Sequence, residues 1–247
     1  MESTVTAIII QARLGSTRLP RKVLKPILER PLIDFLIERL KQVKLVDQII
    51  VATTSSKEDD VLYDILLKAG IDCFRGSEED VLDRYYQTAK VFKVDTIIRI
   101  TADCPLMDPA IVEKVISFYR SNQFDYVSNI HPPTYPDGLD VEIFSFLVLE
   151  KIWKKAAGRE EREHVTLPIV RSGRYHLGNV SGETDYSSER WTVDYEEDYF
   201  LVKKIIEALY PDNPSFNMQD VLEYKASHPE VFKINQRFKR NEVLSEE

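Results

Sequence analysis

Short apolar runs alternate with longer amphipathic segments over the first 122 residues of the chain. The apolar, β-branched runs lie at residues 5–11, 48–52, 71–74 and 96–101. The first of them is continuously apolar rather than alternating, which predicts a strand buried on both faces. Helical spacing or a helix-capping residue marks the segments 31–44, 56–70, 77–94 and 108–122. This order predicts an α/β fold with a mostly parallel sheet and helices on both faces.

The alternation breaks after residue 122. Residues 129–137 hold three prolines and no periodicity, so we expect a loop there. Residues 141–144 and 175–180 have the composition of further strands, and 190–193 that of a last short strand before a helix at 196–209. We therefore predict one domain over residues 1–247. It contains an inserted or exchanged segment at about 125–190 and a helical tail from about 213, packed on the body.

Composition and charge narrow the class of protein. Hydrophobic residues make up 43% and charged residues 30%, as in ordinary soluble proteins. We expect a cytoplasmic protein without a membrane span, because no apolar run approaches the roughly 20 residues needed and the N-terminus has no signal-peptide pattern. Cys73 and Cys104 lack metal-ligand spacing and are expected to be buried thiols. The net charge of −8 argues against nucleic acid as a partner.

The loop after the first strand, residues 11–22, is locally basic. It holds four cations in the ten residues from Arg13 to Lys22, together with the small residues Gly15, Ser16 and Thr17. Such a loop at the carboxyl end of a parallel strand suits phosphate, although a solvated basic turn has the same composition. The glycine-based dinucleotide and Walker loops are excluded, because Gly15 is the only glycine before Gly70.

The loop resembles the signature A-R-x-x-S-T-R-L-P-x-K of sugar-acid cytidylyltransferases, which make CMP-activated acids such as CMP-KDO and CMP-sialic acid. Residues 12–22 match every specified position. The likeness extends over about residues 5–205 and is greatest to the spore-coat polysaccharide biosynthesis branch. It implies a Rossmann-like fold of the nucleotide-diphospho-sugar transferase type. It also implies transfer of CMP from CTP to a sugar acid, or to a related acceptor bearing a phosphate or phosphonate, by a homodimer that releases pyrophosphate.

The resemblance also implies a nucleotide site. The expected contacts are Gln11, Ala12, Arg13, Leu14, Gly15, Ser16, Thr17, Arg18, Lys22, Arg84, Thr101 and Ala102. Of these, Arg13, Arg18 and Lys22 would hold the phosphates, and Arg18 or Lys22 would stabilise the leaving pyrophosphate. For Arg84 the residues themselves favour a surface charge, and only the resemblance implies a contact with the nucleotide. Thr101 and Ala102 depart from the glutamine and glycine that sugar-acid enzymes usually carry, which leaves the acceptor open.

Two carboxylates are expected to hold Mg²⁺. Asp103 follows a central strand in a D-x-P-[LM] segment, and Asp194 opens a V-D-x-x-E-D segment. Carboxylates and phosphate oxygens are the ligands that Mg²⁺ prefers, and the ion would neutralise charge during direct in-line transfer. The alternatives are a turn residue before proline for Asp103 and a helix cap for Asp194.

A further set of polar residues is expected to bind the acceptor. Asp140 and Glu142 lie on one face of a predicted strand, and Arg162 and His164 fall in a segment that matches the spore-coat branch. Pairing of the carboxylates with nearby arginines, and a structural role for His164, are the competing interpretations. A nucleotidyltransferase that uses another nucleoside triphosphate on a sugar phosphate, and a non-catalytic nucleotide-binding module, remain alternative functions. No D-x-D motif of a metal-dependent glycosyltransferase occurs.

Overall fold

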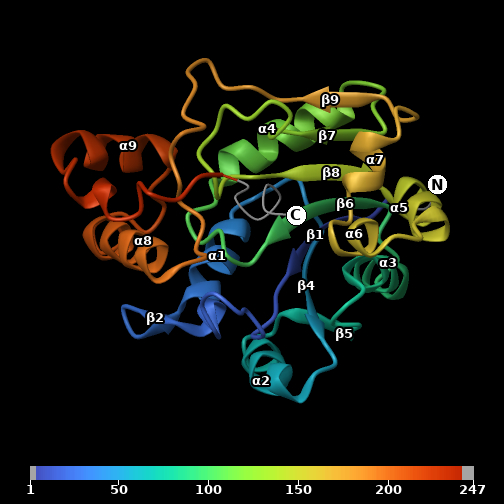
Figure 1. Cartoon of the computed structure of the whole chain (residues 1–247), viewed down its shortest axis with the longest axis horizontal. Helices are drawn as coiled ribbons and strands as arrows, with labels where there is room; N and C mark the ends of the chain where they lie inside the picture. Colours follow the sequence, from blue (N-terminus) through green and yellow to red (C-terminus); the bar gives the residue numbers. More distant parts are fainter. Residues whose placement is uncertain (1–3, 241–247) are drawn as a thin grey trace.

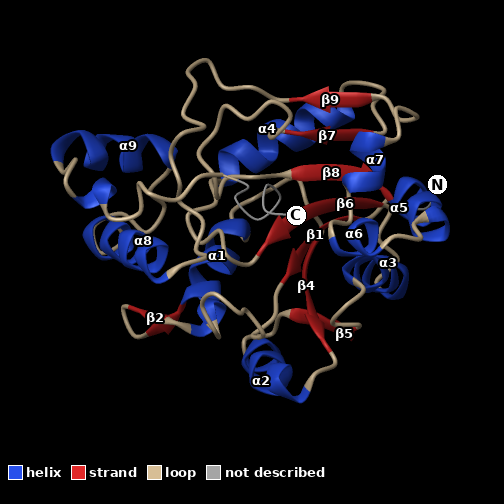
Figure 2. Cartoon of the chain, viewed as in Figure 1, coloured by secondary structure: helices blue, strands red, loops and turns tan. Residues whose placement is uncertain are grey.

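The structure, a computed structural model, describes residues 4–240 of the chain. The protein is built around one seven-stranded sheet (Figures 1 and 2). The strand order is β5-β4-β1-β6-β8-β7-β9. The strands are β1 (Thr6–Gln11), β4 (Gln48–Thr54), β5 (Asp72–Gly76), β6 (Thr96–Thr101), β7 (Tyr126–Ser128), β8 (Glu142–Ser145) and β9 (Leu177–Asn179). Only β8 is antiparallel to its neighbours, β6 and β7. The predicted mostly parallel α/β fold is therefore confirmed.

Helices cover both faces of this sheet (Figure 1). They are α1 (Leu32–Leu40), α2 (Asp60–Lys68), α3 (Val81–Val91), α4 (Pro109–Arg120), α5 (Phe146–Lys155), α6 (Arg159–Glu163), α7 (Leu167–Arg171), α8 (Glu196–Leu209) and α9 (Met218–Ser227). Side chains of α1, α2, α4 and α8 pack with Ile8 and Ile10 in one core, and those of α3 and α5 pack with Ala7 and Ile9 in another. All four of these β1 residues are 0% exposed, because successive strand residues point to opposite faces and both faces are covered.

Capping residues set the starts of α3 and α4, and the cap at Asp108 is the predicted one. The helix predicted from residue 77 begins at Val81, because Asp80 and not Ser77 is its N-cap. Asp80 accepts a hydrogen bond from the Asp83 N–H at 2.8 Å before α3, and Asp108 accepts one from the Ala110 N–H at 2.8 Å before α4. The second oxygen of Asp108 accepts from the Met218 N–H at 2.9 Å. This bond fixes the start of α9 to the body of the protein, and part of the segment after residue 213 is helical.

Other elements differ from the prediction. Residues 190–193 do not form a strand: only Arg190 makes an isolated bridge, with Asp137. The apolar pattern there arises because Trp191 and Val193 are buried in the same core as Ile8 and Ile10. Their N–H groups donate to the Asp137 and Asp103 carbonyls at 2.7 and 2.8 Å. Strand β7, helix α5 and the small hairpin of β2 (Pro26–Ile27) and β3 (Arg30–Pro31) were not predicted.

Short 3₁₀ helices at Lys22–Leu24, Lys57–Asp59 and Val231–Lys233 complete the secondary structure of residues 4–240. Within this range, no helix is both long and apolar enough to cross a membrane. Cys73 is half-buried and Cys104 is buried, and both are free thiols.

Candidate active site

One ammonium group bridges two carboxylates at the carboxyl edge of the sheet. Lys22 Nζ lies 2.6 Å from Asp103 Oδ2 and 2.9 Å from Asp194 Oδ1, and Arg18 Nη2 lies 2.7 Å from the same Asp194 oxygen. Lys22 belongs to the loop after β1, Asp103 follows β6 and Asp194 precedes α8. The structure thus brings together four residues that the sequence assigns to one site.

The carboxylate of Asp194 does not cap the helix that follows it. The helix α8 begins after Tyr195, and the carboxylate of Asp198 accepts the N–H groups of Asp194 and Tyr195 at 3.0 and 3.1 Å. Asp198 therefore does the capping, and Asp194 directs its own oxygens at cations. The helix-cap interpretation of Asp194 is wrong.

Charge pairing outweighs burial at this centre. Burial opposes ionisation of Asp194, but Lys22 and Arg18 hold its pKa well below the ordinary value. Burial also opposes the charged form of Lys22, and Asp103 and Asp194 overcome this and raise the pKa of the ammonium. The Asp194 carboxylate and the Lys22 ammonium are consequently charged at neutral pH.

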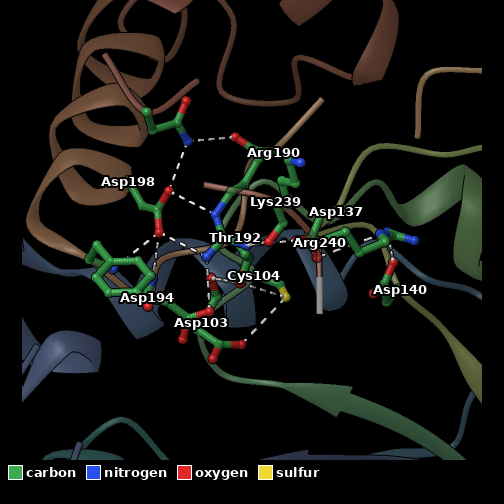
Figure 3. A network of polar contacts seen from close by, with 12 residues as sticks. Asp103, Cys104, Asp137, Asp140, Arg190, Thr192, Asp194, Asp198, Lys239 and Arg240 are labelled. Atoms are coloured by element: carbon green, nitrogen blue, oxygen red, sulfur yellow. Dashed lines mark hydrogen bonds and ion pairs between the residues drawn. The ribbon is translucent and has the colours of Figure 1, made fainter. Parts of the chain in front are cut away.

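Arg190 holds the other side of Asp194 (Figure 3). Its Nη2 donates to Asp194 Oδ2 at 3.0 Å, and its Nε and Nη2 both donate to the fully buried Asp198, each at 3.0 Å. Its Nη1 donates to Asp137 at 2.9 Å. Neither Arg190 nor Asp198 was predicted from the sequence to belong to this site. Their spacing of four residues from Asp194 is not a helical signal, because residues 190–195 precede α8 and are not helical.

The basic loop is anchored through Leu14. Asp59 accepts the Leu14 N–H at 2.7 Å, and the Leu14 carbonyl accepts from the N–H groups of Ser16 and Arg21 at 2.8 and 3.0 Å. The side chains of Ala12, Leu14 and Leu19 are buried, whereas Arg13, Thr17 and Arg18 are exposed. Core packing of the apolar members therefore leaves the polar ones exposed on the surface of the loop.

Arg84 faces this loop from helix α3 and is 0% exposed, so the surface-charge interpretation is wrong. Its Nη1 donates to the carbonyls of Ser77 and Glu78, the latter at 3.4 Å. Its Nε and Nη2 find no hydrogen-bond partner among residues 4–240, and burial lowers the pKa of the guanidinium. A Cβ on Gly15 would lie 3.1 Å from Glu78 Oε1, which places the 77–78 turn beside the loop.

The ends of β1 and β6 join the loop to Asp103. Gln11 pairs with Thr101 in the sheet, and the Ala102 N–H donates to the Gln11 carbonyl at 3.0 Å. Thr101 Oγ1 lies 3.3 Å from Cys104 Sγ. Gln11 Oε1 accepts from Arg99 Nη2 at 3.5 Å, which connects this centre to a neighbouring pocket.

That pocket has a volume of about 410 Å³ and contains three of the four predicted acceptor residues. Its polar lining comprises Arg99, His131, Asp140, Glu142, His164, Thr166 and Arg240. Glu142 pairs with Arg99 and accepts from Tyr126 Oη at 2.7 Å. Burial opposes ionisation of Glu142, and Arg99 reverses the effect and lowers its pKa. Asp140 pairs with Arg240 at 2.6 Å. The predicted pairing of both carboxylates with arginines is present.

Arg162 does not line the pocket. Its Nε lies 3.3 Å from Asp80 Oδ2 and its Nη1 donates to the Trp153 carbonyl at 3.3 Å, so it joins α6 to α3 and α5. His164 does line the pocket, next to Val165, which is fully buried at a φ of 29°. A β-branched residue with positive φ is strained, and such strain concentrates at binding sites.

Comparisons with known proteins agree with this geometry. Residues 7–230 match the family model described as cytidylyltransferase. An uncharacterized protein of Methanocaldococcus jannaschii, MJ1063, is 36% identical over 92% of this chain and 93% of its own. The spore coat polysaccharide biosynthesis protein SpsF of Bacillus subtilis is 34% identical over 80% of this chain and 84% of its own. The structure of a cytidylyltransferase from Leptospira borgpetersenii superposes with a TM-score of 0.90 at 33% identity, covering 96% of this chain and all of that one.

Proposed function

The chain belongs to the cytidylyltransferase family of nucleotidyltransferases, and we propose that it transfers CMP from CTP to a small anionic acceptor with release of pyrophosphate. The acceptor is a sugar acid or a related compound bearing a phosphate or phosphonate, used in polysaccharide or surface-glycan synthesis. The observation that carries the proposal is the bridging of Asp103 and Asp194 by Lys22 beside the basic loop. Phosphoryl transfer needs positioning and charge neutralisation, which these groups supply.

The nucleotide lies along the loop of residues 11–22 in this proposal. Arg13, Thr17 and Arg18 are exposed on the loop, and Gly15 lets a phosphate approach the backbone. Arginine donates to two phosphate oxygens at once, so Arg18 orients the triphosphate while Lys22 contributes a compact charge. Buried Arg84 holds the 77–78 turn that faces the same loop. These contacts would keep the α-phosphorus in line with the attacking oxygen.

Asp103 and Asp194 are the proposed ligands of a divalent cation, Mg²⁺. The donor set fits the ion, because both carboxylates converge on a single cationic group and neither is used to cap a helix. Within residues 4–240 there is no group of three or more histidine, cysteine, aspartate or glutamate ligands. Two carboxylates suffice, because Mg²⁺ commonly completes its shell with phosphate oxygens and water. The bound ion would neutralise negative charge on the phosphates.

The acceptor occupies the neighbouring pocket. Asp140 and Glu142 can accept hydrogen bonds from its hydroxyl groups, and His164 lies in the same lining. Gln11 and Asp137 connect this pocket to the carboxylate centre, through Arg99 and Arg190 respectively. An acceptor oxygen could therefore reach the α-phosphorus without a covalent enzyme intermediate. The family resemblance also suggests a cytoplasmic homodimer that contacts through residues 125–190.

A thermal-shift panel with CTP, UTP, GTP and ATP in the presence of Mg²⁺ tests the donor. We expect CTP to raise the melting temperature most. Pyrophosphate release is then measured with CTP and two acceptors, 3-deoxy-manno-octulosonate and sialic acid. Greater stabilisation by another triphosphate would reassign the donor, and no stabilisation by any of the four would contradict the proposal.

A further inference from the structure

The C-terminal segment 235–240 lies across the carboxyl edge of the sheet, beside the proposed active site. Asn235 is 3% exposed, and its amide donates to the Arg190 carbonyl at 3.0 Å and to Asp198 Oδ1 at 2.8 Å. The Phe238 ring stacks on Tyr195, with centroids 4.0 Å apart and planes within 3°. These contacts attach the segment to the residues that flank Asp194.

Arg240 of this segment lines the acceptor pocket. Figure 3 shows its side chain beside Asp137 and Asp140. Its Nη2 lies 2.6 Å from Asp140 Oδ1 and 3.9 Å from Asp137 Oδ1, and its side chain is 13% exposed. Its Nε is buried and has no hydrogen-bond partner in the described part of the chain. A guanidinium so placed has donor capacity that the protein itself does not use.

Arg99 has the same property in the same pocket. It is paired with Glu142, yet its Nε is buried without a partner among residues 4–240. Arg99 and Arg240 therefore both line the pocket, and each keeps a buried donor without an acceptor among residues 4–240, which is costly. Oxyanions match paired guanidinium groups in both charge and geometry.

We propose that Arg240 binds the anionic group of the acceptor, a carboxylate, phosphate or phosphonate, and so makes the C-terminal segment part of the specificity of the enzyme. This inference rests on the proposed function of the same site. Asp140 holds Arg240 in position when the pocket is empty. The pKa of Asp140 is raised to about 7, mainly by burial. The positive charge of Arg240 opposes this increase, and the negative charges of Asp137 and Glu142 add to it. The Asp140 carboxyl can therefore take up a proton near neutral pH and release the guanidinium to an incoming anion.

The test compares ligand affinities in the full-length protein by NMR titration. The probes are 3-deoxy-manno-octulosonate, glucose 1-phosphate and neutral methyl glucoside. R240M removes the charge but keeps the length of the side chain, and R240K keeps the charge but lacks the planar donor fork. R237M is the matched control, because Arg237 lies in the same segment but pairs with Glu197 and has a side chain that is 69% exposed. Melting temperatures verify that each variant is folded.

We expect at least one anionic probe to bind the wild type, and R240M to weaken that binding about 10- to 100-fold. R240K should weaken it less, and R237M should leave it unchanged. Equal anion affinity in the wild type and R240M, or failure of both anionic probes to bind the wild type, would overturn the proposal. The melting-temperature shift with CTP and Mg²⁺, measured in parallel, separates the two ideas. If CTP and Mg²⁺ do not shift the melting temperature of the wild type, the transferase proposal is contradicted. If R240M keeps this shift and its anion binding is unchanged, only the proposed role of Arg240 is contradicted.

Discussion

Arg190 donates to Asp194 Oδ2 at 3.0 Å, while Lys22 and Arg18 contact the other oxygen of the same carboxylate. Asp194 is thus held from both sides, by the loop after β1 and by a residue that also pairs with the buried Asp198. We expect Arg190 to position Asp194.

Replacing Arg190 with methionine should destabilise the fold as well as the site. The substitution leaves the 0%-exposed Asp198 without its bidentate partner, and breaking a buried pair costs about 3–5 kcal/mol. Urea unfolding measures the change. The control is R237M, whose exposed ion pair with Glu197 should contribute less than about 1 kcal/mol. Equal effects of the two substitutions would contradict the role of Arg190.

Replacing Asp103 with asparagine should reduce CTP-dependent pyrophosphate release by at least about 100-fold while preserving the fold. The amide keeps the shape of the side chain but removes one charge from the proposed metal site. D212N alters an exposed aspartate elsewhere and should retain full activity. Near-normal Mg²⁺-dependent turnover in D103N would exclude Asp103 as a metal ligand.

Substitutions of the adjacent residues Asp59 and Asp60 test whether the hydrogen bond from Leu14 to Asp59 anchors the basic loop. Asp59 is 2% exposed and accepts the Leu14 N–H at 2.7 Å, so D59A should leave this donor unpaired and loosen the loop. We expect a loss of about 1–3 kcal/mol in stability and a raised KM for CTP. D60A removes only a half-exposed pair with Arg75 and serves as the control. An unchanged KM for CTP in D59A would show that the anchor does not shape the nucleotide site.

Binding of an anionic acceptor should weaken as the pH rises through about 7. The pKa of Asp140 is raised from 3.8 to about 7, so the folded protein holds a proton there that the unfolded chain loses at lower pH. The stability that Asp140 contributes is therefore present below about pH 4 and is lost as the pH rises toward 7. Above that value its negative charge competes for Arg240 and repels the acceptor.

This pH dependence is measured as the KM for 3-deoxy-manno-octulosonate between pH 6 and 8.5, in the wild type and in D140N. The wild-type KM should increase with pH and the D140N value should stay nearly flat, because asparagine does not titrate. A similar increase in both proteins would assign the effect to another group.

Local patterns predicted much of the framework. The strand at 96–101 and the helix at 196–209 have the predicted bounds, and the predicted cap at Asp108 is formed. Regular elements depend on neighbouring residues, so their periodicity is visible in the sequence. The pattern failed at 190–193, where apolar residues are buried in the core without forming a strand of the sheet.

The sequence by itself determined the parallel order of the first strands and therefore that Lys22 and Asp103 share one edge of the sheet, because the carboxyl ends of parallel strands lie together. Tertiary structure alone decided which charges pair. Arg240 meets Asp140 across 100 residues, and Asn235 meets Asp198 across 37. Arg84 is buried although nothing in its local pattern distinguishes it from a surface charge. Pairing and burial depend on how distant segments pack, and no local spacing records that packing.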